Sequence, residues 1–124
     1  MKLLGIDYGT KRVGIALSDE EAKFAFPAVV IATSAKLISE IQEIAEKNGV
    51  TEIVIGESRN YKGGANAILP AATELKKSLE VVGFVVHWEP EFMTSVQAER
   101  FQGKTELTDA SAAALILQSY LDKK

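Results

Sequence analysis

Apolar and polar residues alternate over short stretches at the start of the chain, a pattern that predicts β-strands. The first two apolar runs are Leu3–Ile6 and Val13–Leu17, and the short basic segment Gly9–Arg12 between them is typical of a β-hairpin turn. Phe24–Ile31 predicts a third strand, in which Pro27 favours an edge position or the strand start.

The apolar spacing becomes helical after this third strand. Leu37, Ile41 and Ile44 recur at helical intervals in a segment that Ser34 is expected to open and Gly49 to close. The remaining predicted elements are a buried strand at Val50–Gly56, a helix at about Ala65–Leu79, a strand at Val81–Trp88, and helices at about Ser95–Phe101 and Thr108–Leu121.

This order of elements, β-β-β-α-β-α-β-α-α, predicts an α/β fold. Three strands joined without helices should be antiparallel, and the two later strands should add in parallel through right-handed crossovers. The result is a mixed five-stranded sheet flanked by helices. The 124 residues suffice for a single domain, 1–124, with its own core.

Several carboxylates fall where the predicted strands end, and sites in open sheets of this kind gather outside those ends. Asp7 ends the first strand beside the hairpin turn, and Glu89 and Glu91 follow the fifth. A buried, unpaired carboxylate is costly, so Asp7 must meet water, a cation or a hydrogen-bond donor. The alternative is a turn aspartate that caps its own backbone, and this stretch alone leaves both interpretations open.

Asp109 is predicted in the first turn of the last helix, after Thr108 as N-cap. The helix dipole favours a carboxylate there, so stability alone explains it. The run Ala112–Ala114, however, allows a close approach of this helix to the sheet. Asp7, Glu91 and Asp109 would then form an all-oxygen cluster, which suits Mg²⁺ or Mn²⁺. Two such ions about 3.5–4 Å apart clamp the attacking and leaving oxygens in phosphodiester hydrolysis.

The composition restricts which binding partners and which cellular compartment we expect for the protein. A net charge of −3 counts against broad electrostatic binding of nucleic acid. The basic residues lie in or beside predicted loops, where they are either scattered solubilising charges or a local basic rim. The absence of cysteine excludes disulfides and thiolate metal sites. No apolar run reaches the ~18 residues of a membrane span, and we expect a soluble, cytoplasmic protein. The loop residues in question are Lys11, Arg12, Arg59, Lys62, Arg100 and Lys104.

Three further features are predicted to be structural. His87 is interpreted as a half-buried strand histidine and Trp88 as a core residue. Lys123 and Lys124 complement the dipole of the last helix and are expected to need no partner.

Two stretches resemble a known family. Both G-I-D-Y-G-T-K-R-V-G-I-A-L-S-D, residues 5–19, and T-D-A-S-A-A-A-L-I-L-Q-S-Y-L, residues 108–121, are similar to the YqgF family of Holliday junction resolvases and pre-16S rRNA nucleases. The resemblance spans nearly the whole chain and implies an RNase H-like fold, a monomer or homodimer, and Mg²⁺- or Mn²⁺-dependent cleavage of RNA or branched DNA. It implies Asp7, Glu91 and Asp109 as catalytic residues and metal ligands.

Substrate phosphates would meet the basic loops beside these acids. Lys11 and Arg12 in the hairpin turn are the first candidates, and Arg59 and Lys62 are secondary candidates because their loop should border the same cleft.

The chain departs from the family pattern around its fifth strand. Pro90 and Phe92 stand where the family has an acid and an arginine, while Glu91 is kept and Glu89 is a candidate replacement for the acid. Phenylalanine cannot act as a phosphate clamp. A nucleic-acid-binding regulator of the same fold, with weak or no catalysis, is therefore the alternative function.

A third interpretation rests on the motif Asp-x-Gly-Thr at residues 7–10, which also resembles the phosphate-binding turn of actin-like ATPases and sugar kinases. Those proteins need two such domains around a nucleotide, and this chain offers one. We therefore favour this interpretation least.

Overall fold

The computed structural model describes residues 2–9, 11–58, 68–91 and 109–123. The predicted helix at 95–101 and the loop residues Arg59, Lys62, Arg100 and Lys104 lie outside these ranges. The elements of the described part, in chain order, are β1 (Lys2–Tyr8), β2 (Arg12–Ser18), β3 (Ala25–Ala32), α1 (Leu37–Asn48), β4 (Val50–Ser58), α2 (Ile68–Val81), β5 (Val85–Glu91) and α4 (Asp109–Asp122).

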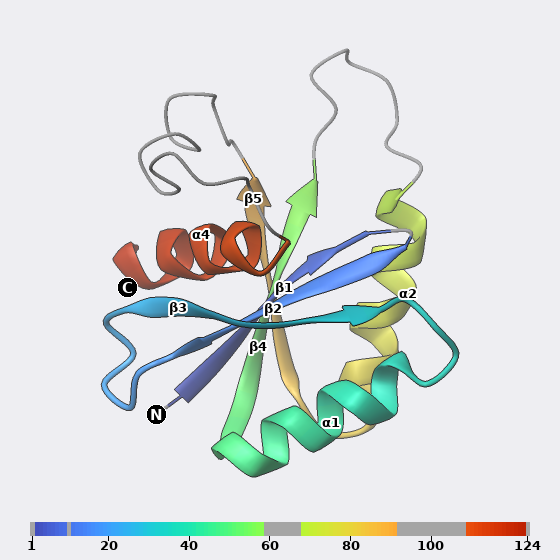
Figure 1. The fold of residues 1–124 in the computed structure, drawn as a ribbon, viewed down its shortest axis with the longest axis horizontal. Coiled ribbons are helices and arrows are strands. Elements are labelled where there is room, and N and C mark those ends of the chain that lie inside the picture. Colours follow the sequence, from blue (N-terminus) through green and yellow to red (C-terminus); the bar gives the residue numbers. More distant parts are fainter. Residues whose placement is uncertain (1, 10, 59–67, 92–108, 124) are drawn as a thin grey trace.

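The strands form one sheet in the order β3-β2-β1-β4-β5 (Figure 1). The pairs β1–β2 and β2–β3 are antiparallel, and the pairs β1–β4 and β4–β5 are parallel. The predicted mixed five-stranded sheet is confirmed, and so is the edge position that Pro27 indicated, because β3 pairs with β2 alone.

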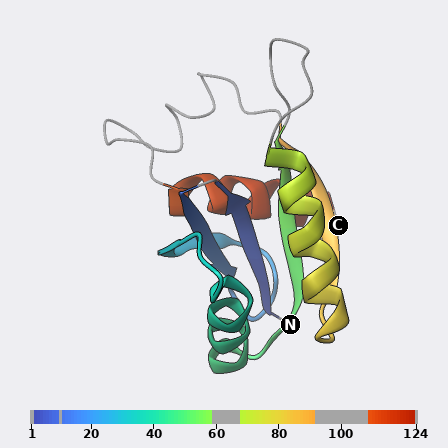
Figure 2. The same ribbon diagram turned by 90° about the vertical axis from the view of Figure 1, so that its right-hand side faces the viewer.

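Each face of the sheet has its own hydrophobic core. Strand residues such as Leu4 and Ile6 pack with α1 and α2 on one face, whereas Leu3 and Val54 pack with α4 on the other. Figure 1 shows α4 and α2 on opposite sides of the strands, and in Figure 2 the axis of α4 runs across β1 and β4 rather than along them. No helix in the described ranges is long and apolar enough to cross a membrane.

Small residues allow α4 to lie close to the sheet. A Cβ atom on Gly5 would stand 2.8 Å from Leu117 Cβ and 3.0 Å from the Ala113 carbonyl oxygen, and a Cβ on Gly56 would overlap Ile116. Ala113 and Ala114 are fully buried against the same face. The close approach predicted from the alanine run is confirmed, and the two strand glycines that complete it were missed.

The start of α1 differs from the prediction. The helix begins at Leu37, not at Ser34. Ser34 instead forms a turn before the helix, in which its Oγ accepts a hydrogen bond from Lys36 N (3.2 Å) and its carbonyl oxygen accepts one from Leu37 N (3.1 Å). The predicted end is confirmed, since Gly49 follows the helix in the left-handed conformation with φ 68°.

The start of β5 was also predicted too early. Val81 belongs to the last turn of α2, and Gly83 turns the chain with φ 110° before β5 begins at Val85. The β-branched residues Val81 and Val82 favour a strand by propensity, but the continuation of α2 overrides it. The end of β5 also differs from the prediction, because the strand continues beyond Trp88 to Glu91.

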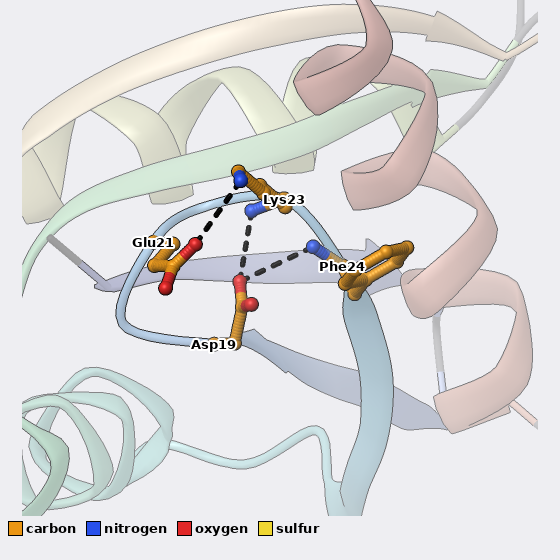
Figure 3. Close-up of polar contacts among 4 residues, drawn as sticks. All are labelled: Asp19, Glu21, Lys23 and Phe24. Carbon is orange, nitrogen blue, oxygen red and sulfur yellow. Dashed lines mark hydrogen bonds and ion pairs between the residues drawn. The ribbon is translucent and has the colours of Figure 1, made fainter.

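The turn between β2 and β3 is organised by Asp19 (Figure 3). Its Oδ1 accepts hydrogen bonds from the backbone N–H groups of Lys23 (2.8 Å) and Phe24 (3.2 Å). These two bonds stabilise the carboxylate, so they lower the pKa of Asp19 below its usual 3.8. Lys23 also forms an exposed ion pair with Glu21 at 3.2 Å.

We expect the stabilising effect of Asp19 to depend on pH in one direction. Because its pKa is lower in the folded than in the unfolded chain, its contribution is present above pH 3.8 and is lost as the pH falls through the folded value. Asp19→Asn should therefore unfold at lower denaturant concentration than the native protein at pH 7, and the two curves should converge in acid. Glu21→Gln, the control in the same turn, should change little, since exposed ion pairs contribute little. A pH-independent difference for Asp19→Asn would contradict this.

Candidate functional site

Asp7 lies near the end of β1 on the face covered by α4. The alternation of β1 puts Leu4 and Ile6 in the core beneath α1 and α2, so Leu3, Gly5 and Asp7 share the opposite face. Asp7 is half-buried, and in the antiparallel pair β1–β2 it lies opposite Gly14 of β2. Its carboxylate is thus fixed on a strand, at the edge of the α4 packing surface, as expected for the end of the first strand.

The hairpin turn next to Asp7 is held in place by β3. Thr33, just after β3, donates a hydrogen bond from Oγ1 to the Gly9 carbonyl oxygen (2.7 Å), and its backbone N–H donates to Lys11 O (3.0 Å). Lys11 in this turn and Arg12, the first residue of β2, are both exposed. Two basic side chains therefore project from a braced turn that directly follows the strand carrying the half-buried carboxylate. Thr33 was not predicted, because no local pattern links it to a turn more than twenty residues earlier.

The register of the parallel strands brings the end of β5 to the same edge of the sheet. Ile6 pairs with Ile55, so the next position in register places Asp7 beside Gly56, and Gly56 in turn pairs with Glu89. Glu91 is the last residue of β5 and pairs with Ser58. The predicted gathering of strand ends is confirmed for the backbone positions.

Helix α4 packs on the same face of the sheet as Asp7. Asp109 is the first residue of α4, as predicted, and Ala113 one turn later has its carbonyl oxygen against Gly5. One helical turn covers ~5.4 Å and two strand residues cover ~6.6 Å. Asp109 therefore lies one helical turn from the contact with Gly5, and Asp7 lies two strand residues from the same contact. The side chains of Glu91 and Asp109 lie outside the described part of the structure.

Glu89 is the buried acidic residue of this region, 2% exposed, and it is bound by α4. Its Oε2 accepts hydrogen bonds from Ser119 Oγ (2.8 Å) and Lys123 Nζ (2.7 Å). The expectation that Lys123 needs no partner is wrong, because it forms an ion pair with this buried carboxylate. Ser119 lies about ten residues, or ~15 Å of helix, beyond Asp109. We therefore do not count Glu89 among the candidate metal ligands. Its contacts with Ser119 and Lys123 instead join β5 to α4.

His87 and Trp88 have the structural roles predicted for them. His87 is half-buried, stacks on Tyr120 with ring centroids 5.1 Å apart, and has Nε2 3.5 Å from Glu52 Oε2. Burial raises the pKa of Tyr120, and the negative charges of Glu52 and Glu89 raise it further. Trp88 packs against the core on the opposite face.

The chemistry of the candidate ligands fits a hard divalent cation. The three predicted residues are all carboxylates, and Mg²⁺ and Mn²⁺ prefer oxygen ligands. Asp7 supplies a half-buried carboxylate on a rigid strand, Glu91 ends β5 at the same edge of the sheet, and Asp109 begins the helix that packs on this face. Among the side chains that the structure describes, no three His, Cys, Asp or Glu residues form a cluster that could hold a metal.

A known family matches nearly the full length of this chain. Residues 1–123 match the family model described as "RuvX: Holliday junction resolvase". A relative from Opitutus terrae is 36% identical over 135 residues, covering 100% of this chain and 93% of the relative. Another from Carboxydothermus hydrogenoformans is 36% identical over 139 residues, covering 100% of this chain and 98% of the relative. Both carry the name "Putative pre-16S rRNA nuclease".

Solved structures with low sequence identity share the fold. Thermus thermophilus RuvC superimposes with a TM-score of 0.67 at 16% identity, covering 99% of this chain and 95% of that one. The Fowlpox virus resolvase, solved in complex with substrate Holliday junction DNA, gives a TM-score of 0.61 at 10% identity, covering 99% and 98% of the two chains. These similarities confirm the predicted RNase H-like arrangement.

Proposed function

We propose the following function for this chain, which belongs to the RuvX family of Holliday junction resolvases: it is a divalent-metal-dependent nuclease that hydrolyses phosphodiester bonds in structured nucleic acid. The observation that carries the proposal is that β1 with Asp7 and β5 with Glu91 end at one edge of the sheet, beside a basic hairpin turn, and that α4, which begins at Asp109, packs on the same face of the sheet as Asp7. The names of the relatives favour pre-16S rRNA processing as the reaction, and those of the structural neighbours favour branched DNA.

Each predicted residue has a role in this proposal. Three carboxylates would coordinate the metal: Asp7 on β1, Glu91 at the end of β5 and Asp109 at the start of α4. When bound, Mg²⁺ or Mn²⁺ would supply activation of the attacking water and neutralisation of charge on the scissile phosphate. Because β1 and β5 belong to one sheet and α4 is packed tightly on it, the three positions are held by rigid elements rather than by loops.

Lys11 and Arg12 would bind substrate phosphates and orient the backbone of the nucleic acid towards Asp7. Arg59 and Lys62 remain secondary candidates for the same task. The local position of these basic residues reconciles nucleic-acid binding with the net charge of −3, since acidic residues such as Glu40 and Glu74 lie on α1 and α2, which pack on the face of the sheet opposite Asp7.

The function is tested by incubating the purified protein with a four-way DNA junction, a structured precursor-like RNA and a single strand, each with Mg²⁺, with Mn²⁺ and with a chelator. Cleavage that requires the metal supports the proposal, and preference among the three substrates identifies the substrate class. The absence of cleavage from all three, with tight binding to one, would instead support the nucleic-acid-binding regulator. Pro90 and Phe92 are the residues that favour this alternative, since they replace an acid and an arginine of the family pattern.

The hairpin turn makes a separate prediction. In Lys11→Ala/Arg12→Ala, nucleic-acid affinity should fall, and the slope of log affinity against log salt should become shallower by about 0.7–0.9 for each phosphate that the variant no longer neutralises. Lys47→Ala/Lys77→Ala removes the same charge from exposed positions of α1 and α2, on the other face of the sheet, and should change both quantities less. Fluorescence anisotropy at several salt concentrations measures them. Equal effects of the two double variants would show that the hairpin turn is not part of the nucleic-acid-binding surface.

A further inference from the structure

Thr33, the residue after β3, is bonded to both sides of the hairpin turn that joins β1 to β2. Its hydroxyl Oγ1 donates a hydrogen bond to the Gly9 carbonyl oxygen (2.7 Å), and its backbone N–H donates to the Lys11 carbonyl oxygen (3.0 Å). Gly9 directly follows β1, and Lys11 directly precedes β2. A single half-buried residue therefore fixes the two ends of the turn relative to each other.

The two hydrogen bonds of Thr33 place different demands on the side chain. The backbone bond continues the ladder between β2 and β3, in which Arg12 pairs with Ala32, so any residue with an N–H group can form it. The bond to Gly9 requires a hydroxyl. It connects the end of β3 to the β1 side of the turn, although β2 separates β1 from β3 in the sheet. Replacing the hydroxyl by a methyl group would therefore release the β1 side of the turn alone.

The two sides of the turn lie in direct contact. A Cβ atom on Gly9 would stand 2.5 Å from the Arg12 carbonyl oxygen. A change in the position of Gly9 is therefore transmitted to the backbone that carries the exposed side chains of Lys11 and Arg12. Binding a phosphate orders such long side chains at an entropic cost, and a backbone that is already fixed keeps this cost small.

Asp7 is held independently of Thr33. It lies two residues before Gly9, within β1, opposite Gly14 in the ladder between β1 and β2. Loss of the Thr33 hydroxyl should therefore loosen the basic turn and leave the carboxylate of the candidate metal site in place.

We propose that Thr33 is a positioning residue for substrate binding: its hydroxyl holds the hairpin turn so that Lys11 and Arg12 meet the phosphates of the nucleic-acid backbone. This role rests on the proposed function, and Thr33 itself does not touch the substrate. The phosphate contacts are made in the ground state and in the transition state alike. Loss of the hydroxyl should therefore raise the nucleic-acid Kd and the KM for cleavage while kcat stays unchanged.

Three single variants test the hydroxyl. Thr33→Val should weaken nucleic-acid binding and raise KM by about three- to tenfold, the range expected for one hydrogen bond. Thr33→Ser keeps the hydroxyl and should bind like the native protein. Thr51→Val is the matched control, because Thr51 is exposed near the start of β4, at the opposite end of the strand from Gly56, and it should change neither quantity. Fluorescence anisotropy measures Kd, and steady-state cleavage of the same substrate gives KM and kcat.

A double-variant comparison separates positioning from a general loss of structure. In the Lys11→Ala/Arg12→Ala background, Thr33→Val should cause no further loss of affinity, because the side chains that the turn positions are gone. Low salt keeps the weakened binding measurable. Urea unfolding verifies that every variant is folded under the conditions of the assay.

The outcomes distinguish a failure of this role from a failure of the function. A native protein that neither binds nor cleaves nucleic acid would overturn both. With a native protein that binds, the positioning role is overturned if Thr33→Val binds equally well, if Thr33→Ser shows the same loss as Thr33→Val, or if the loss is equal in both backgrounds. A fall in kcat at unchanged KM would also overturn it, because Thr33 would then act on the reacting groups and not on the turn.

Discussion

Asp7→Asn is expected to fold like the native protein and to lose nucleic-acid cleavage by several orders of magnitude. Asparagine has the shape of aspartate and serves as well in a turn or as a cap, so a purely structural Asp7 would tolerate the change. As a metal ligand, however, Asp7 would supply a negative charge that asparagine lacks. Nucleic-acid binding should be kept or improved, because one repulsive charge has been removed from the surface that faces the phosphates.

The same variant tests the metal directly through stability. Mg²⁺ or Mn²⁺ should raise the melting temperature of the native protein, by the equivalent of ~2.7 kcal/mol at a hundredfold excess over the dissociation constant, and should not do so in Asp7→Asn. Asp122→Asn, an exposed acid at the last residue of α4, is the control for both assays. Equal metal-dependent cleavage by the native protein and by Asp7→Asn would show that Asp7 is a turn residue and not a metal ligand.

Gly5→Ala is expected to have the largest effect on stability. The new methyl group would lie 2.8 Å from Leu117 Cβ and 3.0 Å from the Ala113 carbonyl oxygen, and neither atom can move away by rotating a side chain. The whole of α4 must therefore shift, at a cost of about 1–3 kcal/mol. The shift would also move the first turn of α4 away from the end of β1, so cleavage should decrease even at temperatures where the variant remains folded.

A comparison of two double variants isolates this mechanism. At Gly56 the obstructing atoms belong to the side chain of Ile116, so Ile116→Ala should make room for Gly56→Ala, and the double variant should be more stable than the sum of the single changes predicts. At Gly5 the obstructing atoms include Leu117 Cβ, which alanine retains, so Leu117→Ala should not relieve Gly5→Ala. Urea unfolding of the single and double variants measures both couplings. Equal coupling energies would show that α4 adjusts at both contacts.

The sequence predicted those parts of the fold that depend on neighbouring residues. The strand directions, the edge position of β3 and the location of Asp7 near the end of β1 followed from short apolar runs, from Pro27 and from the connections between the elements. The errors at Ser34 and Val81 have a different origin. Both residues have the right local propensity, for a helix cap and for a strand, and in both cases the packing of the adjacent helix sets the boundary instead.

The sequence predicted that α4 lies close to the sheet, but it did not reveal which residues α4 contacts. Lys123 carries a pattern typical of a solvated helix end, and only the fold brings it to Glu89, 34 residues away. Gly5 and Gly56 were a usable signal, because glycine inside a strand indicates close approach of another backbone or ligand. The carboxylate cluster was predicted from the order of elements and from the family resemblance, and its side-chain geometry remains a proposal.

The position of α4 has a consequence for how the protein is made. The N-terminal strands leave the ribosome first, but the helix that covers one face of them is encoded near the C-terminus. The side chain of Gln118 reaches Ala25 across 93 residues of sequence, and at ~5–20 residues per second this helix follows the strand by about 5–20 s. During that interval the nascent chain exposes Leu3, Ala16 and Val54, which the finished protein buries beneath α4. Chaperone demand during translation should therefore be concentrated on this one face of the sheet.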